Sequence, residues 1–183
     1  MDFQKTLRNV DKSLLINALK ELDKHVSYHF KIVIVGGAAM IIHFGATRAT
    51  RDVDAIVEGD NMREIKKASR IVADKFQLDE DWLNDSVKGF ATILPTDFHK
   101  RINRLELGLH NIEIFALGIA EQLIMKIVAL REQDLEDIEI LLPQLNADDK
   151  RTVISNMHYI NKIRPDWAQK IQYFLEEQGW KID

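Results

Sequence analysis

The chain contains no cysteine and only three prolines among its 183 residues. The absence of cysteine excludes disulfide scaffolds, thiolate zinc sites and iron–sulfur clusters. No apolar run approaches the ~20 residues that a membrane-spanning helix needs, and the polar N-terminal segment lacks the apolar stretch of a secretory signal. With 46% apolar and 30% charged residues, the composition favours a folded domain over long disorder. We therefore expect a cytoplasmic globular protein with no membrane association.

Positive charge is also scarce in the middle of the chain. The formal net charge is −4, but residues 51–150 hold 13 basic and 21 acidic side chains, a net charge of −8. General binding to duplex nucleic acid depends on Lys and Arg neutralising phosphates, so this segment is a poor candidate for it. A solvated acidic surface explains most of these carboxylates, and a metal-binding centre could use a few of them.

The periodicity of the apolar residues changes along the chain. It predicts helices over residues 13–26, 61–76, 119–131, 134–142, 147–160 and 165–178, with a short helix after residue 37. It predicts strands over residues 31–35, 52–57, 87–94, 104–109 and 111–116. Asn146 is a suitable N-cap, and Pro165 suits the first turn of a helix.

This order of elements predicts an α+β fold, because strands and helices do not alternate regularly. We expect a small mixed β-sheet flanked by helices over residues 1–116, and a C-terminal helical region over residues 117–183. No linker or repeat separates the two parts, so they are expected to form one compact unit.

Three local patterns carry possible chemistry. Gly36 and Gly37 follow an apolar strand, where glycine lets the backbone approach a ligand and the following helix offers N–H groups to a phosphate. Asp52 and Asp54 alternate with Val53, which places both carboxylates on one face of a strand. Lys126 lies in an apolar stretch, where an ammonium either extends to solvent or binds an anion. Each pattern alone has an ordinary structural explanation: a turn, a solvated strand edge or a salt-bridged helix.

Taken in this order, the three patterns resemble the signature of the nucleotidyltransferase superfamily, which has the polymerase-β-like fold. The signature is an apolar strand, a Gly-Gly pair, a short helix and Asp-hydrophobic-Asp, here IVIVGGAAMIIHFGATRATRDVDAIV. The chain is also similar to small bacterial proteins related to AbiEii-type toxins of toxin–antitoxin systems. Two motifs carry that likeness: Arg48-x-Thr50-x-Asp52-Val53-Asp54, and Lys126 followed by Arg131-x-x-Asp134-x-x-Asp137.

The resemblance implies Mg²⁺-dependent transfer of a nucleoside monophosphate from a nucleoside triphosphate to a hydroxyl acceptor. RNA, including the tRNA 3′ end, is an implied acceptor, and an antitoxin protein is an implied partner. Asp52, Asp54 and a third carboxylate would hold Mg²⁺. The implied triphosphate-binding residues are Gly36, Gly37, Arg48, Thr50 and Arg51. Lys126 would contact the triphosphate, and Asp134 would orient Lys126 or the base.

The third carboxylate is the open point. Glu113 is our choice because it is central in an apolar strand expected beside Asp52 and Asp54, and Glu106 is the rival. If neither completes the site, the alternative is a catalytically inactive binding module with the same fold. A third possibility is a helical interaction protein, which predicts no cleft near Asp52.

Overall fold

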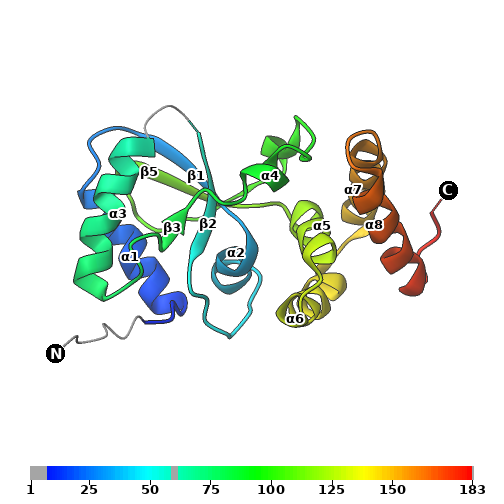
Figure 1. The fold of residues 1–183 in the computed structure, drawn as a ribbon, viewed down its shortest axis with the longest axis horizontal. Coiled ribbons are helices and arrows are strands. Elements are labelled where there is room, and N and C mark those ends of the chain that lie inside the picture. Colours follow the sequence, from blue (N-terminus) through cyan, green and yellow to red (C-terminus); the bar gives the residue numbers. More distant parts are fainter. Residues whose placement is uncertain (1–7, 59–61, 183) are drawn as a thin grey trace. The chain divides into compact units, whose positions relative to one another are not determined.

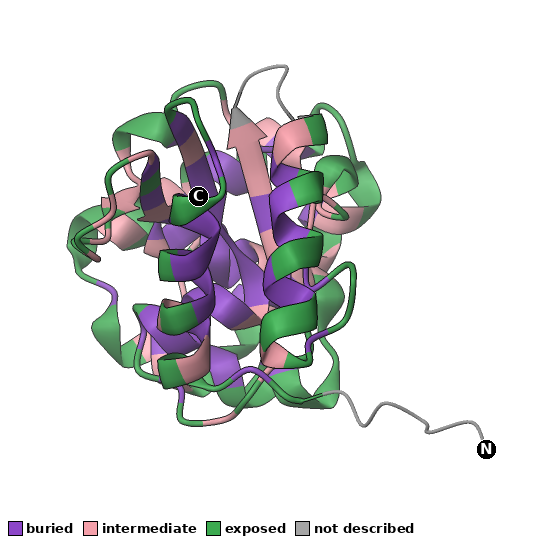
Figure 2. Cartoon of the chain, turned by 90° about the vertical axis from the view of Figure 1, so that its left-hand side faces the viewer, coloured by how far each residue is buried: buried purple, intermediate pink, exposed green. Residues whose placement is uncertain are grey.

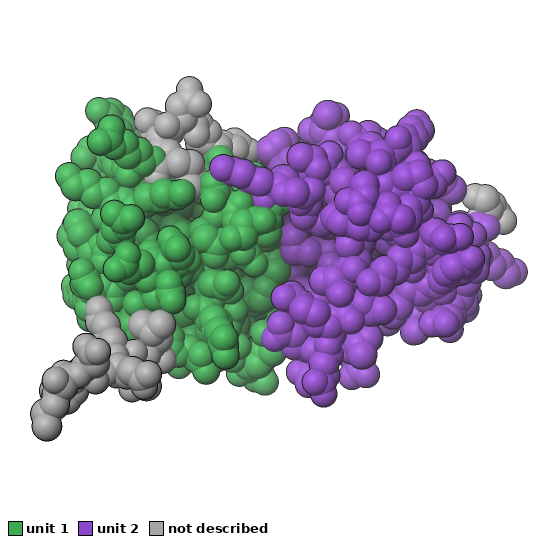
Figure 3. Space-filling model, viewed as in Figure 1, with its two compact units in different colours: residues 1–87, 103–116 green, residues 88–102, 117–183 purple. Residues whose placement is uncertain are grey.

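The computed structural model describes residues 8–58 and 62–182. The chain divides into two compact units, shown in separate colours in Figure 3. The first comprises residues 1–87 and 103–116, and the second comprises residues 88–102 and 117–183. Residues 88–102, which we had assigned to the α/β part, therefore group with the helical unit.

The first unit is built on a mixed five-stranded sheet (Figure 1). Its strands are β1 (Phe30–Ile34), β2 (Val53–Glu58), β3 (Leu83–Asn84), β4 (Asn103–Arg104) and β5 (Ile112–Ala116), in the order β3-β2-β1-β5-β4. Strand β1 is antiparallel to β2 and parallel to β5, while β3 is parallel to β2 and β4 is antiparallel to β5. The expected α+β class with a small mixed sheet is confirmed.

Three helices accompany the sheet: α1 (Lys12–Lys24), α2 (Gly36–Ile42) and α3 (Met62–Phe76). Helices α1 and α3 lie side by side over one face of the sheet, each with an exposed outer side and a buried inner side (Figure 2). The Asp23 carboxylate at the end of α1 accepts hydrogen bonds from the backbone N–H groups of His110, Asn111 and Ile112, at 2.9, 2.7 and 2.9 Å. Asp23 therefore fixes the start of β5 against α1.

The second unit is helical. Its helices are α4 (Lys88–Ala91), α5 (Ile119–Ala129), α6 (Glu132–Leu141), α7 (Ala147–Asn161) and α8 (Pro165–Glu177). Asn146 caps α7 and Pro165 begins α8, as the sequence predicts. The buried carboxylate of Glu121 accepts from Arg101 Nε at 2.7 Å and from Asn156 Nδ2 at 3.0 Å, which joins residues 88–102 to α5 and α7.

Two strand predictions were wrong. Residues 87–94 form the short helix α4 and turns, in which the Thr92 hydroxyl donates to the Gly89 carbonyl at 2.8 Å. The strand expected over residues 104–109 is reduced to Asn103–Arg104, although its pairing with β5 is as expected. Within the described residues, no helix is both long and apolar enough to cross a membrane.

Candidate active site

Asp54 is the second residue of β2, and Asp52 directly precedes this strand. The Val35 N–H donates to the Asp54 carbonyl at 3.0 Å, and the Val53 N–H donates to the Trp82 carbonyl, so neighbours on both sides fix this segment. Val53 and Ala55 are fully buried, whereas Asp54 is half-buried and Asp52 is exposed. Because side chains alternate along a strand, this burial pattern indicates that the two carboxylates share the face opposite Val53.

The loop before β2 approaches the glycine pair. Gly36 has φ +61°, a left-handed conformation that favours glycine. A Cβ atom added to Gly37 would lie 3.1 Å from Thr50 Oγ1 and 3.5 Å from both terminal nitrogens of Arg48. Gly37, Arg48 and Thr50 are therefore neighbours, and the missing side chain of Gly37 leaves room for the Thr50 hydroxyl.

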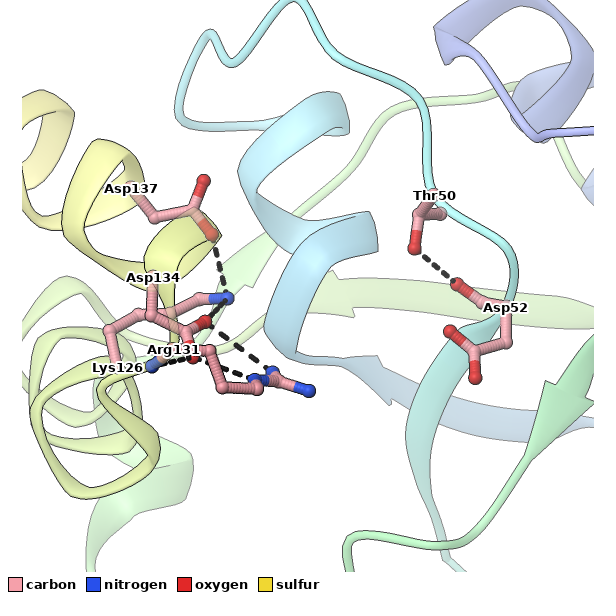
Figure 4. Close-up of polar contacts among 6 residues, drawn as sticks. All are labelled: Thr50, Asp52, Lys126, Arg131, Asp134 and Asp137. Atoms are coloured by element: carbon pink, nitrogen blue, oxygen red, sulfur yellow. Dashed lines mark hydrogen bonds and ion pairs between the residues drawn. The ribbon is translucent and has the colours of Figure 1, made fainter.

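Thr50 links this loop to the carboxylates. Its hydroxyl donates to the Asp52 carbonyl at 3.1 Å (Figure 4). Its backbone exchanges two hydrogen bonds with Val10, at 2.7 and 3.0 Å, so the chain before α1 holds the loop in place. The structure thus brings together Gly37, Arg48, Thr50 and Asp52, which are separated by up to 15 positions in the sequence.

Asp52 also lines a polar cavity of about 450 Å³, together with Arg51. The wall is completed by the segment around β3 and by one residue of α3. The sequence leaves two interpretations of Trp82 and Asn84, which either line the site or close a loop, and it favours the loop. In the structure Asn84 lines the cavity, whereas Trp82 is fully buried.

Glu113 does not join Asp52 and Asp54. Strand register pairs Glu113 with Lys31, whereas Asp54 is level with Val35, four residues further along β1. At ~3.3 Å per residue this separates the two levels by roughly 13 Å, and Glu113 is also two strands away from β2. The Glu113 carboxylate is instead 3.2 Å from Arg104 Nη2 and half exposed.

Glu106, the rival candidate, does not join Asp52 and Asp54 either. It follows the edge strand β4 and lies 3.4 Å from Arg104 Nε. Among residues 8–58 and 62–182, no three acidic or histidine side chains are placed to hold a metal ion. The expected three-carboxylate centre is therefore not assembled, and the observed donor set is the pair Asp52 and Asp54.

The second unit contains a buried ionic cluster at the junction of α5 and α6 (Figure 4). Lys126 Nζ is 2.9 Å from Asp134 Oδ1 and 2.7 Å from Asp137 Oδ2. The Lys126 side chain is 2% exposed, and both carboxylates are fully buried. Arg131 donates to Asp134 Oδ2 from its backbone N–H at 3.0 Å and from Nε at 2.8 Å.

These contacts keep Asp134 ionised. Burial raises the pKa of the Asp134 carboxyl, but the hydrogen bonds from Arg131 and Lys126 outweigh burial and hold this pKa below its usual value. Asp134 thus holds Lys126, as the resemblance implies for an orienting residue, but Asp137 holds it as closely. The two carboxylates occupy two of the three N–H groups of the Lys126 ammonium. Contact between Lys126 and a triphosphate stays a prediction.

The family model for nucleotidyltransferases of unknown function, DUF6036, matches residues 6–178. Among solved structures, an antigenic nucleotidyltransferase-like protein from Paracoccidioides brasiliensis has 17% sequence identity and a TM-score of 0.43, with 88% of this chain and 90% of that chain covered. The chain matches no curated protein.

Proposed function

Because the chain belongs to the DUF6036 family of nucleotidyltransferases, we propose that it transfers a nucleoside monophosphate from a nucleoside triphosphate to a hydroxyl group. The observation that carries this proposal is the position of Asp52 and Asp54. Asp52 directly precedes β2 and Asp54 is its second residue, and the loop of Arg48 and Thr50 that leads into this strand approaches Gly37.

The donor set suits Mg²⁺. Mg²⁺ in proteins is commonly bound by one or two carboxylates and completes its coordination with water and substrate phosphates. Asp52 and Asp54 supply two carboxylates on one strand face, and an all-protein cage is not needed. When bound, the ion would neutralise charge on the phosphates.

The residues of this chain then have separate tasks. Arg48, held beside Gly37, can donate two parallel hydrogen bonds to phosphate oxygens. The hydrogen bond from the Thr50 hydroxyl fixes the backbone of Asp52, so the Asp52 carboxylate is positioned before substrate arrives. The acceptor hydroxyl oxygen forms a bond to the α-phosphorus. The bond between the α-phosphorus and the oxygen that bridges it to the β-phosphorus breaks. Pyrophosphate leaves with that electron pair, and the hydroxyl proton passes to a carboxylate of the site.

The test is transfer of label from an α-³²P nucleoside triphosphate in the presence of Mg²⁺ and total RNA or small hydroxyl compounds. Asp52→Asn and Asp54→Asn should each lower the rate by at least about 100-fold, the usual effect of removing one strong electrostatic contribution. Asp74→Asn, an exposed carboxylate of α3, is the matched control and should retain the wild-type rate. Label transfer that survives both substitutions would overturn the assignment.

One observation favours a second candidate, a catalytically inactive binding module: among the described residues, no third carboxylate is placed to hold a metal ion together with Asp52 and Asp54. Such a protein would bind nucleoside triphosphate with Mg²⁺ but transfer no label to any acceptor. Calorimetric titration of wild-type protein with a nonhydrolysable triphosphate, run alongside the transfer assay, separates the two candidates.

An RNA acceptor, a toxin role and an antitoxin partner rest on the resemblance to AbiEii-type toxins alone. Their test is growth of a bacterial host after induction of the chain. Arrest by wild-type protein, but not by Asp52→Asn, together with labelled cellular RNA, would support them. Unimpaired growth with active purified protein would exclude the toxin role.

A further inference from the structure

The cavity beside Asp52 has no assigned role in the proposed function. It measures about 450 Å³ and lies along the edge strand β3. Strand β3 runs parallel to β2, with Asn84 level with Asp54. The cavity therefore adjoins Asp52 on the β3 side of β2, away from β1.

The β3 side of this cavity is held by hydrogen bonds within the chain. The Ser86 N–H donates to Asn84 Oδ1 at 2.9 Å, and Asn84 Nδ2 donates to the Asp81 carbonyl at 3.4 Å. The Asp81 N–H in turn donates to Asp79 Oδ1 at 3.0 Å. These turns fix the backbone that carries the cavity wall, so the cavity is formed without a ligand.

Oxygen acceptors dominate this wall. Four carboxylates line the cavity against two cationic side chains, a net charge of −2, and an amide and a hydroxyl lie between them. Carboxylate and amide oxygens accept hydrogen bonds from hydroxyl and ammonium groups. A phosphate-rich ligand would instead place like charges close together.

We propose that this cavity binds the acceptor substrate, and that the acceptor is a small polyhydroxylated molecule that is uncharged or carries an amine. The volume of the cavity lies within the range of small-molecule sites. The cavity opens beside Asp52, where the acceptor hydroxyl must arrive. Asp81 and Asp85 are the specificity residues, because they supply acceptors for hydroxyl or ammonium groups apart from Asp52. The inference rests on the proposed function, since it names the acceptor of that reaction.

Binding is measured first, without nucleotide, by saturation-transfer NMR. The probes are D-glucosamine, myo-inositol, glucose 6-phosphate and a short RNA oligonucleotide. We expect glucosamine or inositol to bind, and the phosphorylated sugar and the RNA to bind at least tenfold more weakly. Asp81→Asn combined with Asp85→Asn should weaken glucosamine binding at least tenfold, while Asp74→Asn leaves it unchanged.

Transfer is measured second, with α-labelled triphosphate and Mg²⁺. The Asp81→Asn, Asp85→Asn double variant should raise KM for the acceptor at least tenfold, with KM for the triphosphate within twofold of wild type. Label transfer to RNA in the absence of polyol binding would overturn this inference and leave the proposed function standing. Polyol binding without any transfer would overturn the acceptor assignment together with the proposed function.

Discussion

At the scale of single residues, Gly37 lies close to Thr50 and Arg48, the residues that we propose border the phosphates. A methyl group there would lie 3.1 Å from Thr50 Oγ1 and 3.5 Å from the Arg48 guanidinium. The 3.1 Å contact is tighter than an ordinary van der Waals contact, so the Thr50 hydroxyl must shift, whereas 3.5 Å to Arg48 is an ordinary contact that fills the space beside the guanidinium.

Gly37→Ala should therefore raise KM for the nucleoside triphosphate about tenfold, equivalent to about 1.4 kcal/mol of binding free energy. The matched control is Gly89→Ala on α4, where an added Cβ meets no atom within 4 Å. Steady-state kinetics with the triphosphate as varied substrate gives the answer. Equal KM values for the two variants would show that Gly37 does not border the triphosphate.

Residue spacing along one segment was sufficient to predict that Gly37, Thr50 and Asp52 are neighbours. The glycine pair and the alternation of Asp52 and Asp54 are local patterns, and local geometry decides where such side chains point. Glu113 failed as a candidate because its distance from Asp54 depends on the register of β5 on β1, which no local pattern encodes. Strand β3 was not predicted for a different reason, since its two residues are too few to show the period of a strand.

At the scale of elements, the cluster of Lys126, Asp134 and Asp137 ties α5 to α6. Burying charges costs several kcal/mol per ion, and pairing must offset this cost. Helices α5 and α6 were predictable from their apolar period. Their attachment through one lysine and two carboxylates was not, because the same residues also fit a solvent-exposed salt-bridged helix.

Lys126→Met should lower the free energy of unfolding by about 3–5 kcal/mol, since it leaves two buried carboxylates without their cation. Urea unfolding followed by circular dichroism measures the loss. Glu136→Gln, an exposed residue of α6, should stay within about 0.5 kcal/mol of wild type. A Lys126→Met variant as stable as the wild type would mean that the cluster does not stabilise the α5–α6 junction.

At the scale of the whole molecule, the acidic middle of the chain separates into groups with different roles. Asp134 and Asp137 neutralise a buried lysine, while Glu113 pairs with Arg104. Asp52, Asp81 and Asp85 border one cavity. The negative charge of this segment is thus divided among separate ion pairs and one cavity. We therefore expect pH to change the stability of the protein through individual ion pairs rather than through its net charge.

Glu21 provides the clearest case. Its carboxylate on α1 lies 2.7 Å from Lys75 Nζ on α3, 3.0 Å from Lys24 Nζ and 3.3 Å from His25 Nε2. The hydrogen bond from Lys75, followed by that from Lys24, lowers the pKa of Glu21 from 4.5 to about 2. Because the folded pKa lies below the unfolded one, this stabilisation is complete above pH 4.5 and is lost as the pH falls toward 2. Both lysines are largely exposed, so we expect about 1 kcal/mol.

The measurement compares wild type with Glu21→Gln by urea unfolding at pH 7, 5, 4 and 3. The wild type should be more stable by about 1 kcal/mol at pH 7 and pH 5, and the difference should shrink at pH 4 and pH 3 as the unfolded chain takes up a proton at this position. High salt should reduce the difference at pH 7, because exposed ion pairs are screened. A difference that stays constant from pH 7 to pH 3 would assign the effect of Glu21→Gln to packing, and the contact between α1 and α3 would then owe nothing to the charge of Glu21.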